Sequence, residues 1–221
     1  MIKILMQFLV IFLPWKIRRY ILNRFWGYHI HPTARIGLSY IYPKHLTMEE
    51  GAYIGHLNVA IHLELIHMEK DCTICQRNWI TGFPLENKTK FQNFPNRKPF
   101  LLMKKDSAIT KQHIIDCTDM VTIGEFTSIA GYSTQILSHS TSLQMNDGGC
   151  EPISIGHHCF IGTRSVILPG SVLPNHSVLG AGAVLKKKFS EEYVLYGGVP
   201  ARYIKQMDKS YAFFSRTYRP K

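Results

Sequence analysis

The sequence predicts an all-β protein whose chain winds into a parallel coil with three short strands per turn. One stretch carries a branched aliphatic residue at every sixth position: Ile155, Ile161, Ile167, Leu173, Leu179 and Leu185. A small residue follows four places after each of the first five, and the next residue is again apolar. An α-helix repeats every 3.6 residues and a strand every 2, so neither produces this pattern. Coils stacked around a triangular core do, because each aliphatic residue then lies on its equivalent one coil away.

The composition limits the class of protein. The 221 residues suffice for one buried domain with extensions, and 26 Lys+Arg against 15 Asp+Glu give a formal net charge of +11. Such a charge suits a membrane surface or a phosphorylated ligand, and because the chain has no nucleic-acid-binding motif we expect no nucleic-acid partner. Five cysteines, an odd number, argue against a disulfide framework. No second ligand pair follows Cys72-x-x-Cys75, so we predict no metal site and a buried structural role for Cys72.

Residues 1–29 are predicted to form a hydrophobic and basic helical extension. The apolar run Ile4–Leu13 is too short to span a bilayer, and no signal-peptide cleavage site follows it. Arginines then alternate with Ile17, Tyr20 and other apolar residues. This pattern favours peripheral contact of residues 1–25 with an anionic membrane, which implies a cytoplasmic protein at the inner face of the plasma membrane. The alternative is a hydrophobic helix packed on its own domain or on a neighbouring subunit.

The coiled domain is predicted over residues 30–206, with two excursions. The six-residue pattern begins at Ile30 and Ile36, and it is absent from 81–106 and from 137–152. Long segments that leave a compact fold are often functional, so we expect the site there. Residues 207–221 form a tail rich in aromatic residues, which predicts a short C-terminal helix packed across the end of the coil.

Three stretches resemble the hexapeptide-repeat acyltransferase superfamily. They are Ile123–Ile129 (IGEFTSI), the excursion with Leu137-Ser-His139, and residues 155–205, which end in GVPARYIK. The resemblance covers roughly residues 105–206 and is closest to the galactoside, maltose and xenobiotic O-acetyltransferase branch; the first hundred residues look more like a polysaccharide-associated subgroup. It implies a left-handed parallel β-helix, a homotrimer and acetyl-CoA as the acyl donor.

Transfer of an acetyl group to an alcohol requires a base, and a neutral imidazole with a pKa near the working pH fills this role well. His139 lies in the second excursion, where the resemblance implies the catalytic histidine. His113 is the competing candidate. Most of the other histidines are expected to face solvent, including His157, His158 and His176, which fall at turn positions of the repeat.

The resemblance also implies the residues that contact the two substrates. Those expected to contact acetyl-CoA are Phe160, Thr163, Ala181, Lys186, Lys187, Arg202 and Lys205. The four basic residues among them suit its phosphates. Asp116 is the candidate for binding the acceptor; the alternative is a carboxylate at a corner of the coil that bonds its own backbone.

These observations favour an acetyl-CoA-dependent O-acetyltransferase that acts on a sugar hydroxyl, in surface polysaccharide or lipid-linked oligosaccharide biosynthesis. An N-acyltransferase on a nucleotide-linked amino sugar and a non-catalytic β-helical scaffold remain alternatives. A γ-type carbonic anhydrase shares the fold, but the chain lacks the histidine spacing of its zinc site.

Overall fold

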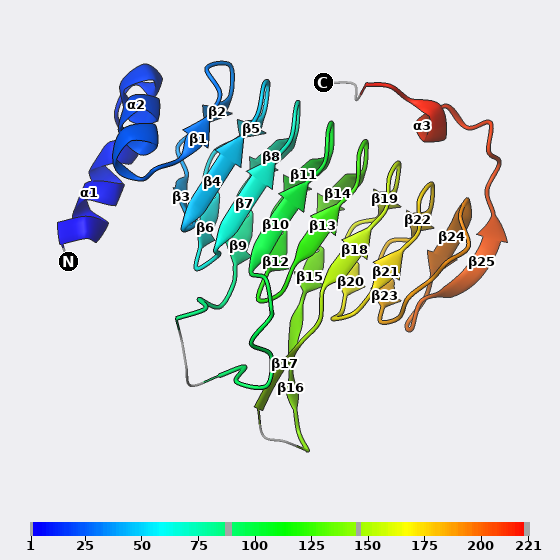
Figure 1. The fold of residues 1–221 in the computed structure, drawn as a ribbon. Coiled ribbons are helices and arrows are strands. Elements are labelled where there is room, and N and C mark those ends of the chain that lie inside the picture. The colour runs from blue at the N-terminus through cyan, green and yellow to red at the C-terminus, as the bar shows by residue number, and fades with distance from the viewer. Residues whose placement is uncertain (1, 87–89, 145–146, 219–221) are drawn as a thin grey trace.

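A computed structural model describes residues 2–86, 90–144 and 147–218. Residues 87–89 and 145–146 of the predicted excursions and 219–221 of the predicted tail lie outside this description. The chain forms a coil of three parallel sheets, with two helices at one end and two segments that project from one edge (Figure 1).

The three sheets are named A, B and C in the order in which each turn of the coil visits them. Sheet A contains β1 (His29–Ile30), β4 (His45–Met48), β7 (Leu65–Met68), β10 (Phe100–Met103), β13 (Val121–Ile123), β18 (Ile153–Ile155) and β21 (Val172–Leu173). Sheet B contains β2 (Arg35–Ile36), β5 (Tyr53–Ile54), β8 (Thr73–Gln76), β11 (Ala108–Lys111), β14 (Ser128–Tyr132), β19 (Phe160–Ile161), β22 (Val178–Leu179), β24 (Val194–Gly197) and the antiparallel β25 (Arg202–Gln206). Sheet C contains β3 (Tyr40–Tyr42), β6 (Val59–Ile61), β9 (Trp79–Thr81), β12 (Ile114–Asp116), β15 (Gln135–Leu137), β20 (Val166–Ile167) and β23 (Val184–Leu185).

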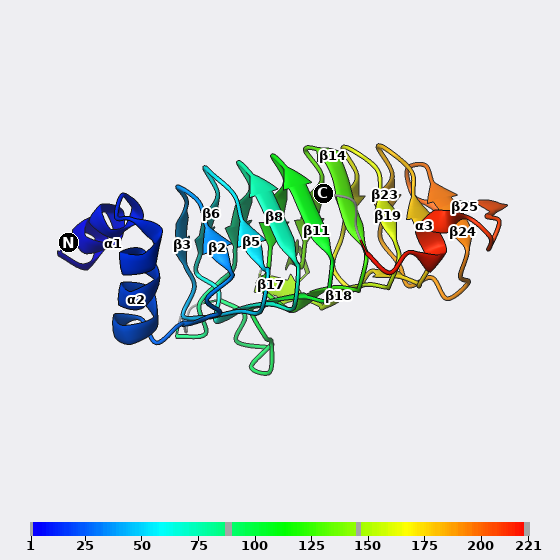
Figure 2. The ribbon, with the colours of Figure 1, turned by 90° about the horizontal axis from the view of Figure 1, so that it is seen from above.

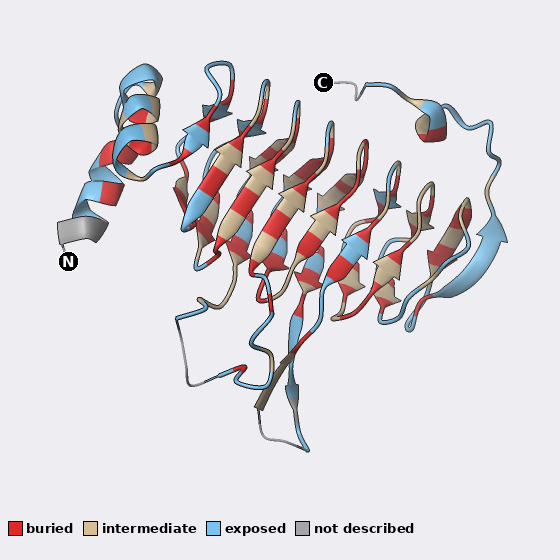
Figure 3. Ribbon diagram, viewed as in Figure 1, coloured by how far each residue is buried: buried red, intermediate tan, exposed pale blue. Residues whose placement is uncertain are grey.

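The six-residue pattern produces the core. Within sheet B the strand register aligns Ile109, Ile129, Ile161 and Leu179 on successive coils, and all four are fully buried. Buried residues alternate with more exposed ones along most strands (Figure 3). The predicted all-β parallel coil is therefore confirmed.

Each turn has three corners, named A/B, B/C and C/A after the sheets they join. Several corner residues other than glycine have a left-handed backbone, such as His158 (φ 51°) and Arg164 (φ 57°). The small residue of each repeat follows such a corner and points inward; Cys159 and Ser165 have no exposed surface. A larger side chain there would collide with the neighbouring coils.

Two helices, α1 (Ile2–Ile11) and α2 (Trp15–Phe25), cover the first coil. Pro14 precedes α2, and Gly27 follows it with φ 66°, as is common at helix ends. The buried Arg18 guanidinium donates hydrogen bonds to the carbonyls of Gly37 (2.8 Å) and Ser39 (2.9 Å), which the coil leaves without strand partners at its open end. Residues 1–29 thus include helices packed on their own domain, the second of the two alternatives.

Much of α1 nevertheless remains exposed: Leu5, Leu9 and, just after the helix, Phe12 keep 61–75% of their surface. In the part of the chain that is described, no helix has both the length and the hydrophobicity needed to cross a bilayer.

Both excursions leave the C/A corner. The first is shorter than predicted: the chain rejoins sheet A at Phe100, so 100–106 belong to the coil. Leu101 and Met103 are buried there, and Met103 lies six residues before Ile109, in phase with the repeat of the next strand. The second excursion is a β-hairpin of β16 (His139–Ser142) and β17 (Asp147–Cys150).

The C-terminal segment corrects two predictions. The helix α3 (Ala212–Ser215) does not cross the end of the coil; it lies along the A/B corner, on the side opposite the excursions (Figures 1 and 2). Its Phe214 packs edge-on against His176. His176 stacks on His158, so aromatic neighbours partly cover both rings, and neither side chain is as exposed as predicted. Corner residues of successive coils lie one above the other, so the His158 and His176 rings contact each other, and His176 contacts Phe214, where water would otherwise lie.

Candidate active site

His139 and Asp116 come together where the β16–β17 hairpin leaves the coil. Asp116 ends β12 and is paired with Leu137 at the end of β15, two residues before His139. The distance from His139 Nδ1 to Asp116 Oδ2 is 2.7 Å. Because the carboxylate accepts, Nδ1 carries the hydrogen, and the lone pair of the neutral ring lies on Nε2. This side chain keeps 44% of its surface exposed, so a substrate can reach it.

The contacts of Asp116 are those of a residue that positions His139, rather than those of an exposed group that binds an acceptor. Its Oδ1 accepts a hydrogen bond from Thr118 Oγ1 (2.7 Å), and its Oδ2 accepts from the amide (3.1 Å) and the hydroxyl (3.0 Å) of Ser138. The carboxylate has only 6% of its surface exposed. Both oxygens are thus engaged inside the corner. The alternative prediction, a carboxylate that bonds only to the nearby backbone, describes one of these contacts and omits the one to the His139 ring.

Charge and hydrogen bonding set the protonation of this pair. Burial alone would raise the pKa of Asp116, but the hydrogen bonds from His139, Thr118 and Ser138 outweigh it and hold the pKa below its ordinary value. The hydrogen bond to Asp116 raises the pKa of His139 against the opposing effect of burial. The imidazole is therefore a stronger base than an isolated histidine.

The first excursion forms one wall of the site. Phe91 is buried and meets the His139 ring edge-on, with centroids 5.8 Å apart. It also lies against Gly148 of the hairpin, where an added Cβ would be 2.4 Å from its ring. Asn93 of the first excursion also donates a hydrogen bond to Asp147 of the hairpin. The two excursions thus pack on each other, and the ring of His139, at the base of the hairpin, lies against Phe91 of the first excursion.

Arg97 fixes this wall to the coil. Its guanidinium is buried and donates hydrogen bonds to the carbonyls of Phe83, Pro84 and Thr118. It also lies over the ring of Phe91, 5.2 Å from the centroid. Neither Arg97 nor Phe91 was predicted as a site residue from the sequence. The only available signal was a lone arginine among aromatic residues in an excursion without repeats.

His113, the competing base, has a structural role. It is 1% exposed; its Nδ1 accepts from the amide of Thr134 (3.1 Å), so Nε2 carries the hydrogen that is donated to Thr110 Oγ1 (2.9 Å). Burial lowers the pKa of His113 to about 4. Both ring nitrogens are used inside the core, so no substrate proton can reach them.

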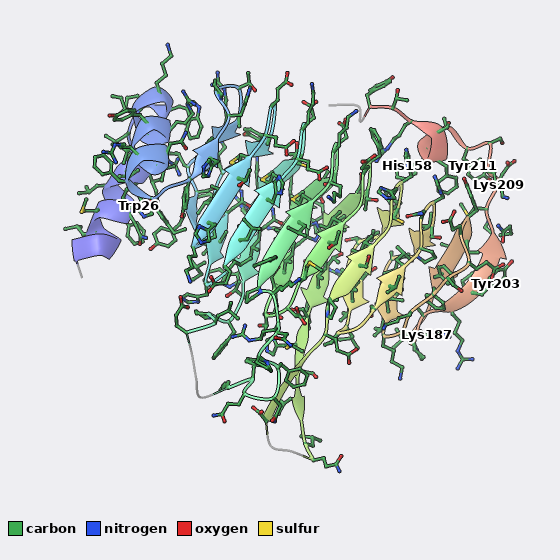
Figure 4. The ribbon with its side chains drawn as sticks, in the orientation of Figure 1. Trp26, His158, Lys187, Tyr203, Lys209 and Tyr211 are labelled. Carbon is green, nitrogen blue, oxygen red and sulfur yellow. The ribbon has the colours of Figure 1, made fainter. Side chains whose placement is uncertain are left out.

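Of the residues predicted to contact the donor, Lys186 and Lys187 share the C/A corner with His139. Sheet C aligns Ile136, Ile167 and Leu185, so the residues after Leu185 lie two coils beyond those after Ile136. Two strand spacings correspond to roughly 10 Å. Lys187 points outward at the edge from which the excursions leave (Figure 4).

Thr163 and Ala181 lie at a different corner, B/C, on consecutive coils. Thr163 Oγ1 accepts from the Tyr132 amide and donates to its carbonyl. A Cβ on Gly162 would be 2.5 Å from the Ala181 nitrogen, so glycine is required for the coils to approach. In one chain these residues are separated from His139 by the width of sheet C.

The remaining predicted contacts lie elsewhere. Phe160 is at the start of β19, and its ring meets Phe213 of the C-terminal segment edge-on. Arg202 and Lys205 are exposed on β25 at the last coil. Lys186 and Lys187 therefore lie at the same corner of the coil as His139. The other residues predicted to contact acetyl-CoA lie at the B/C corner or in sheet B of this chain.

The candidate metal ligands do not assemble. Among the described residues, no group of three His, Cys, Asp or Glu side chains has the arrangement of a metal site. Cys72 is buried, and its Sγ lies 3.3 Å from the carbonyl of Met103.

Part of the chain is similar to known sequences. Residues 152–187 match the family described as the hexapeptide repeat of succinyl-transferase. The galactoside O-acetyltransferase of Escherichia coli (strain K12) is 35% identical over 100 residues, which are 42% of this chain and 49% of the relative. The chain thus matches about half the length of this curated relative.

Solved structures share the fold. A hexapeptide-repeat acetyltransferase of Vibrio cholerae, solved with acetyl-CoA, aligns over 72% of each chain with a TM-score of 0.50 and 22% identity. A polysialic acid O-acetyltransferase aligns over 81% of this chain and 84% of its own, with a TM-score of 0.50 and 18% identity. The predicted left-handed parallel β-helix is thereby confirmed.

Proposed function

We propose that this chain, a hexapeptide-repeat protein with a left-handed β-helix, is an acetyl-CoA-dependent O-acetyltransferase that acts on a sugar hydroxyl. One observation carries the proposal: an exposed histidine, hydrogen-bonded to a buried carboxylate, shares a corner of the coil with two lysines. A base with access to solvent and a cationic edge beside it are what transfer from a CoA thioester to an alcohol requires.

In the proposed reaction, His139 Nε2 takes the proton from the acceptor hydroxyl as its oxygen attacks the thioester carbonyl. The C–S bond then breaks, and the imidazolium returns the proton to the departing CoA thiolate. Asp116 keeps Nδ1 protonated and stabilises the imidazolium. Such a base typically contributes about 10²–10⁴-fold to the rate. Lys186 and Lys187 would hold the CoA phosphates, and Thr163 and Ala181 its pantetheine arm.

An oxygen acceptor is favoured over an amine because the relative with 35% identity is a galactoside O-acetyltransferase. A sugar in surface polysaccharide or lipid-linked oligosaccharide biosynthesis suits the exposed apolar α1 and the basic residues after it, which support peripheral contact with the inner face of the plasma membrane. We therefore propose a cytoplasmic enzyme.

We also propose a homotrimer. Within one chain, Thr163 and Ala181 lie at the B/C corner and His139 at the C/A corner. If the B/C corner of one copy faces the C/A corner of the next, the base and the pantetheine contacts lie in one groove. The site would then be complete only between subunits, and three-fold symmetry would make three such grooves.

A panel of free, nucleotide-linked and alkyl-linked sugars, each as a hydroxyl acceptor and as an amino-sugar acceptor, tests the proposal. The readout is thiol release from acetyl-CoA together with mass analysis of the product. We expect O-acetylated sugar and stoichiometric CoA. Amide products alone would establish an N-acyltransferase, and absence of both turnover and CoA binding would support a scaffold.

A further inference from the structure

A cavity of about 920 Å³ lies between the two N-terminal helices and the first coils. Its lining is mainly apolar, with side chains from α1, α2 and the C/A corner: Met6, Val10, Ile21, Phe25, Tyr42 and Leu63. Hydrogen bonds attach α1 to the coil beside this cavity: the Tyr40 and Tyr42 hydroxyls donate to the side chain (2.6 Å) and the carbonyl (2.8 Å) of Gln7. Such a volume is in the range of ligand sites.

One end of this cavity is polar and borders the first excursion. Lys44 pairs there with Glu64 (2.9 Å) and Glu86 (2.6 Å), and Pro84 completes the border. The same excursion carries Phe91 to His139 on its other side. A single excursion therefore separates the cavity from the candidate base.

The cavity and His139 lie along the same edge of the coil. The strand register of sheet C aligns four residues on successive coils: Ile61, Thr81, Asp116 and Leu137. His62 and Leu63, which line the cavity, come directly after Ile61. Ser138 and His139 come directly after Leu137, so they occupy the equivalent corner positions three coils away. Three strand spacings separate the two levels, roughly 14 Å. An extended ligand can reach from one to the other.

The outer side of the cavity opens toward an apolar, basic surface. Met6 and Phe25, which line it, keep 51% and 71% of their surface exposed, and Leu5 and Leu9 of α1 are also more than half exposed. The first 48 residues contain seven Lys or Arg and no Asp or Glu. Of the seven, Arg18 is buried and Lys44 is paired with two glutamates, whereas Lys16 and Arg24 of α2 are exposed. An anionic lipid surface complements this combination. The shape and chemistry point to one hydrocarbon chain as the occupant, drawn from that surface.

We propose that this cavity binds the hydrocarbon chain of an amphiphilic acceptor, whose sugar then reaches His139 across the first excursion. The identity of the acceptor as a lipid-linked sugar rests on the function proposed above. Binding of the chain itself does not, because it needs neither acetyl-CoA nor His139.

Binding is tested first, on the full chain without acetyl-CoA. Methyl, octyl and decyl glucosides are titrated by calorimetry below their critical micelle concentrations. Each buried methylene contributes about 0.8 kcal/mol, which corresponds to about fourfold in affinity, so decyl glucoside should bind up to about 15-fold more tightly than octyl glucoside. Methyl glucoside should show no binding at this site. Affinity independent of chain length would overturn the proposal.

Two neighbouring residues of α1 provide matched variants. Met6 lines the cavity and Leu5 does not, and both are more than half exposed, so tryptophan is tolerated sterically at either position. Met6→Trp fills the cavity and should weaken decyl glucoside binding at least tenfold; Leu5→Trp should leave it unchanged. Equal loss in both variants, or in neither, would mean adsorption to the helix surface and would contradict a cavity site.

A second pair guards against local misfolding of α1. Phe25→Ser removes part of the cavity lining and should weaken the binding of decyl glucoside. Tyr20→Ser changes an exposed residue of the same helix that does not line the cavity, and it should leave this binding unchanged. If the alkyl chain binds as expected but no alkyl glycoside is acetylated, the cavity assignment stands and the acceptor assignment is wrong.

Discussion

The Nδ1 atom of His139 lies 2.7 Å from Oδ2 of Asp116, and the two residues come from different coils. The histidine belongs to the hairpin, while the carboxylate is buried at the end of β12. The rigid coil thus orients a side chain on a projecting segment. This relationship turns an exposed histidine into a candidate base with a defined tautomer.

Replacing Asp116 by Asn should lower the rate and shift its pH dependence. The neutral base requires a pH above the raised pKa of His139, so wild-type kcat/KM should fall as the pH drops through that value. Without the carboxylate, the pKa of His139 returns toward its ordinary value, and the acidic limb should move to lower pH. The maximal rate should fall at least tenfold because the tautomer is no longer fixed. A rate profile combined with NMR titration of His139 measures both effects; an unshifted profile would contradict the role of Asp116.

Adding a methyl group at Gly148 should disturb the aromatic wall. The new Cβ would lie 2.4 Å from the Phe91 ring, so Phe91 must move away from His139. Gly148→Ala should lower kcat several-fold, and the neighbouring Gly149→Ala, whose Cβ would meet Ser140 at 3.6 Å, should have little effect. Similar kinetics for both variants would argue against a functional wall.

Lys187→Ala should raise the KM for acetyl-CoA, because Lys187 is exposed on the edge that carries His139. The increase should shrink at high salt, since exposed charges are screened. Lys188→Ala, in the same triplet, is the control: its backbone bridges to Val172, and it was not among the predicted contacts. Dephospho-CoA derivatives identify which phosphate is bound. Equal effects of the two variants would point to general charge attraction.

His113 should make the fold sensitive to acid. Its folded-state pKa of about 4 lies below the ordinary 6.5, so the unfolded chain binds a proton first as the pH falls. The stabilisation is therefore present above pH 6.5 and declines toward pH 4, by up to about 2 kcal/mol at pH 5. Urea unfolding at pH 7 and pH 5 should show a smaller decline for His113→Asn than for the wild type. An identical decline would place the acid sensitivity elsewhere.

Subunit complementation tests the shared groove. His139→Ala and Ala181→Trp should each be inactive as homo-oligomers, the first for lack of a base and the second because a large side chain fills the donor groove. Refolded mixtures should regain activity, since some interfaces then pair an intact C/A corner with an intact B/C corner. Mixtures that remain inactive while forming trimers would refute a site between subunits.

The repeat made the coil predictable, because every inward position obeys one steric rule that sequence alone displays. Ile155 to Leu185 fall where that rule requires. The first excursion was harder: its end at Phe100 depends on pairing with Leu65, a contact between residues distant in sequence. His139 was found through resemblance to a motif, and Asp116 was selected for another role. Its real contacts require knowing that β12 and β15 are neighbours.

The aromatic and cationic residues of the site were not predictable in the same way. Phe91 and Arg97 lie in a segment without periodicity, and their partners are carbonyls and rings brought together by the fold. The C-terminal segment was misplaced for a related reason: nothing in Phe214 itself indicates that His176 and Tyr193 form the surface it covers.

Replacing His139 by Ala shows whether this histidine is the general base. Acetyl transfer from acetyl-CoA to the best acceptor of the panel is compared between the wild type and His139→Ala, with circular dichroism and CoA binding as checks on the fold. We predict a loss of at least about 100-fold in kcat with CoA affinity unchanged. A folded variant that transfers acetyl groups at the wild-type rate would show that His139 is not the base.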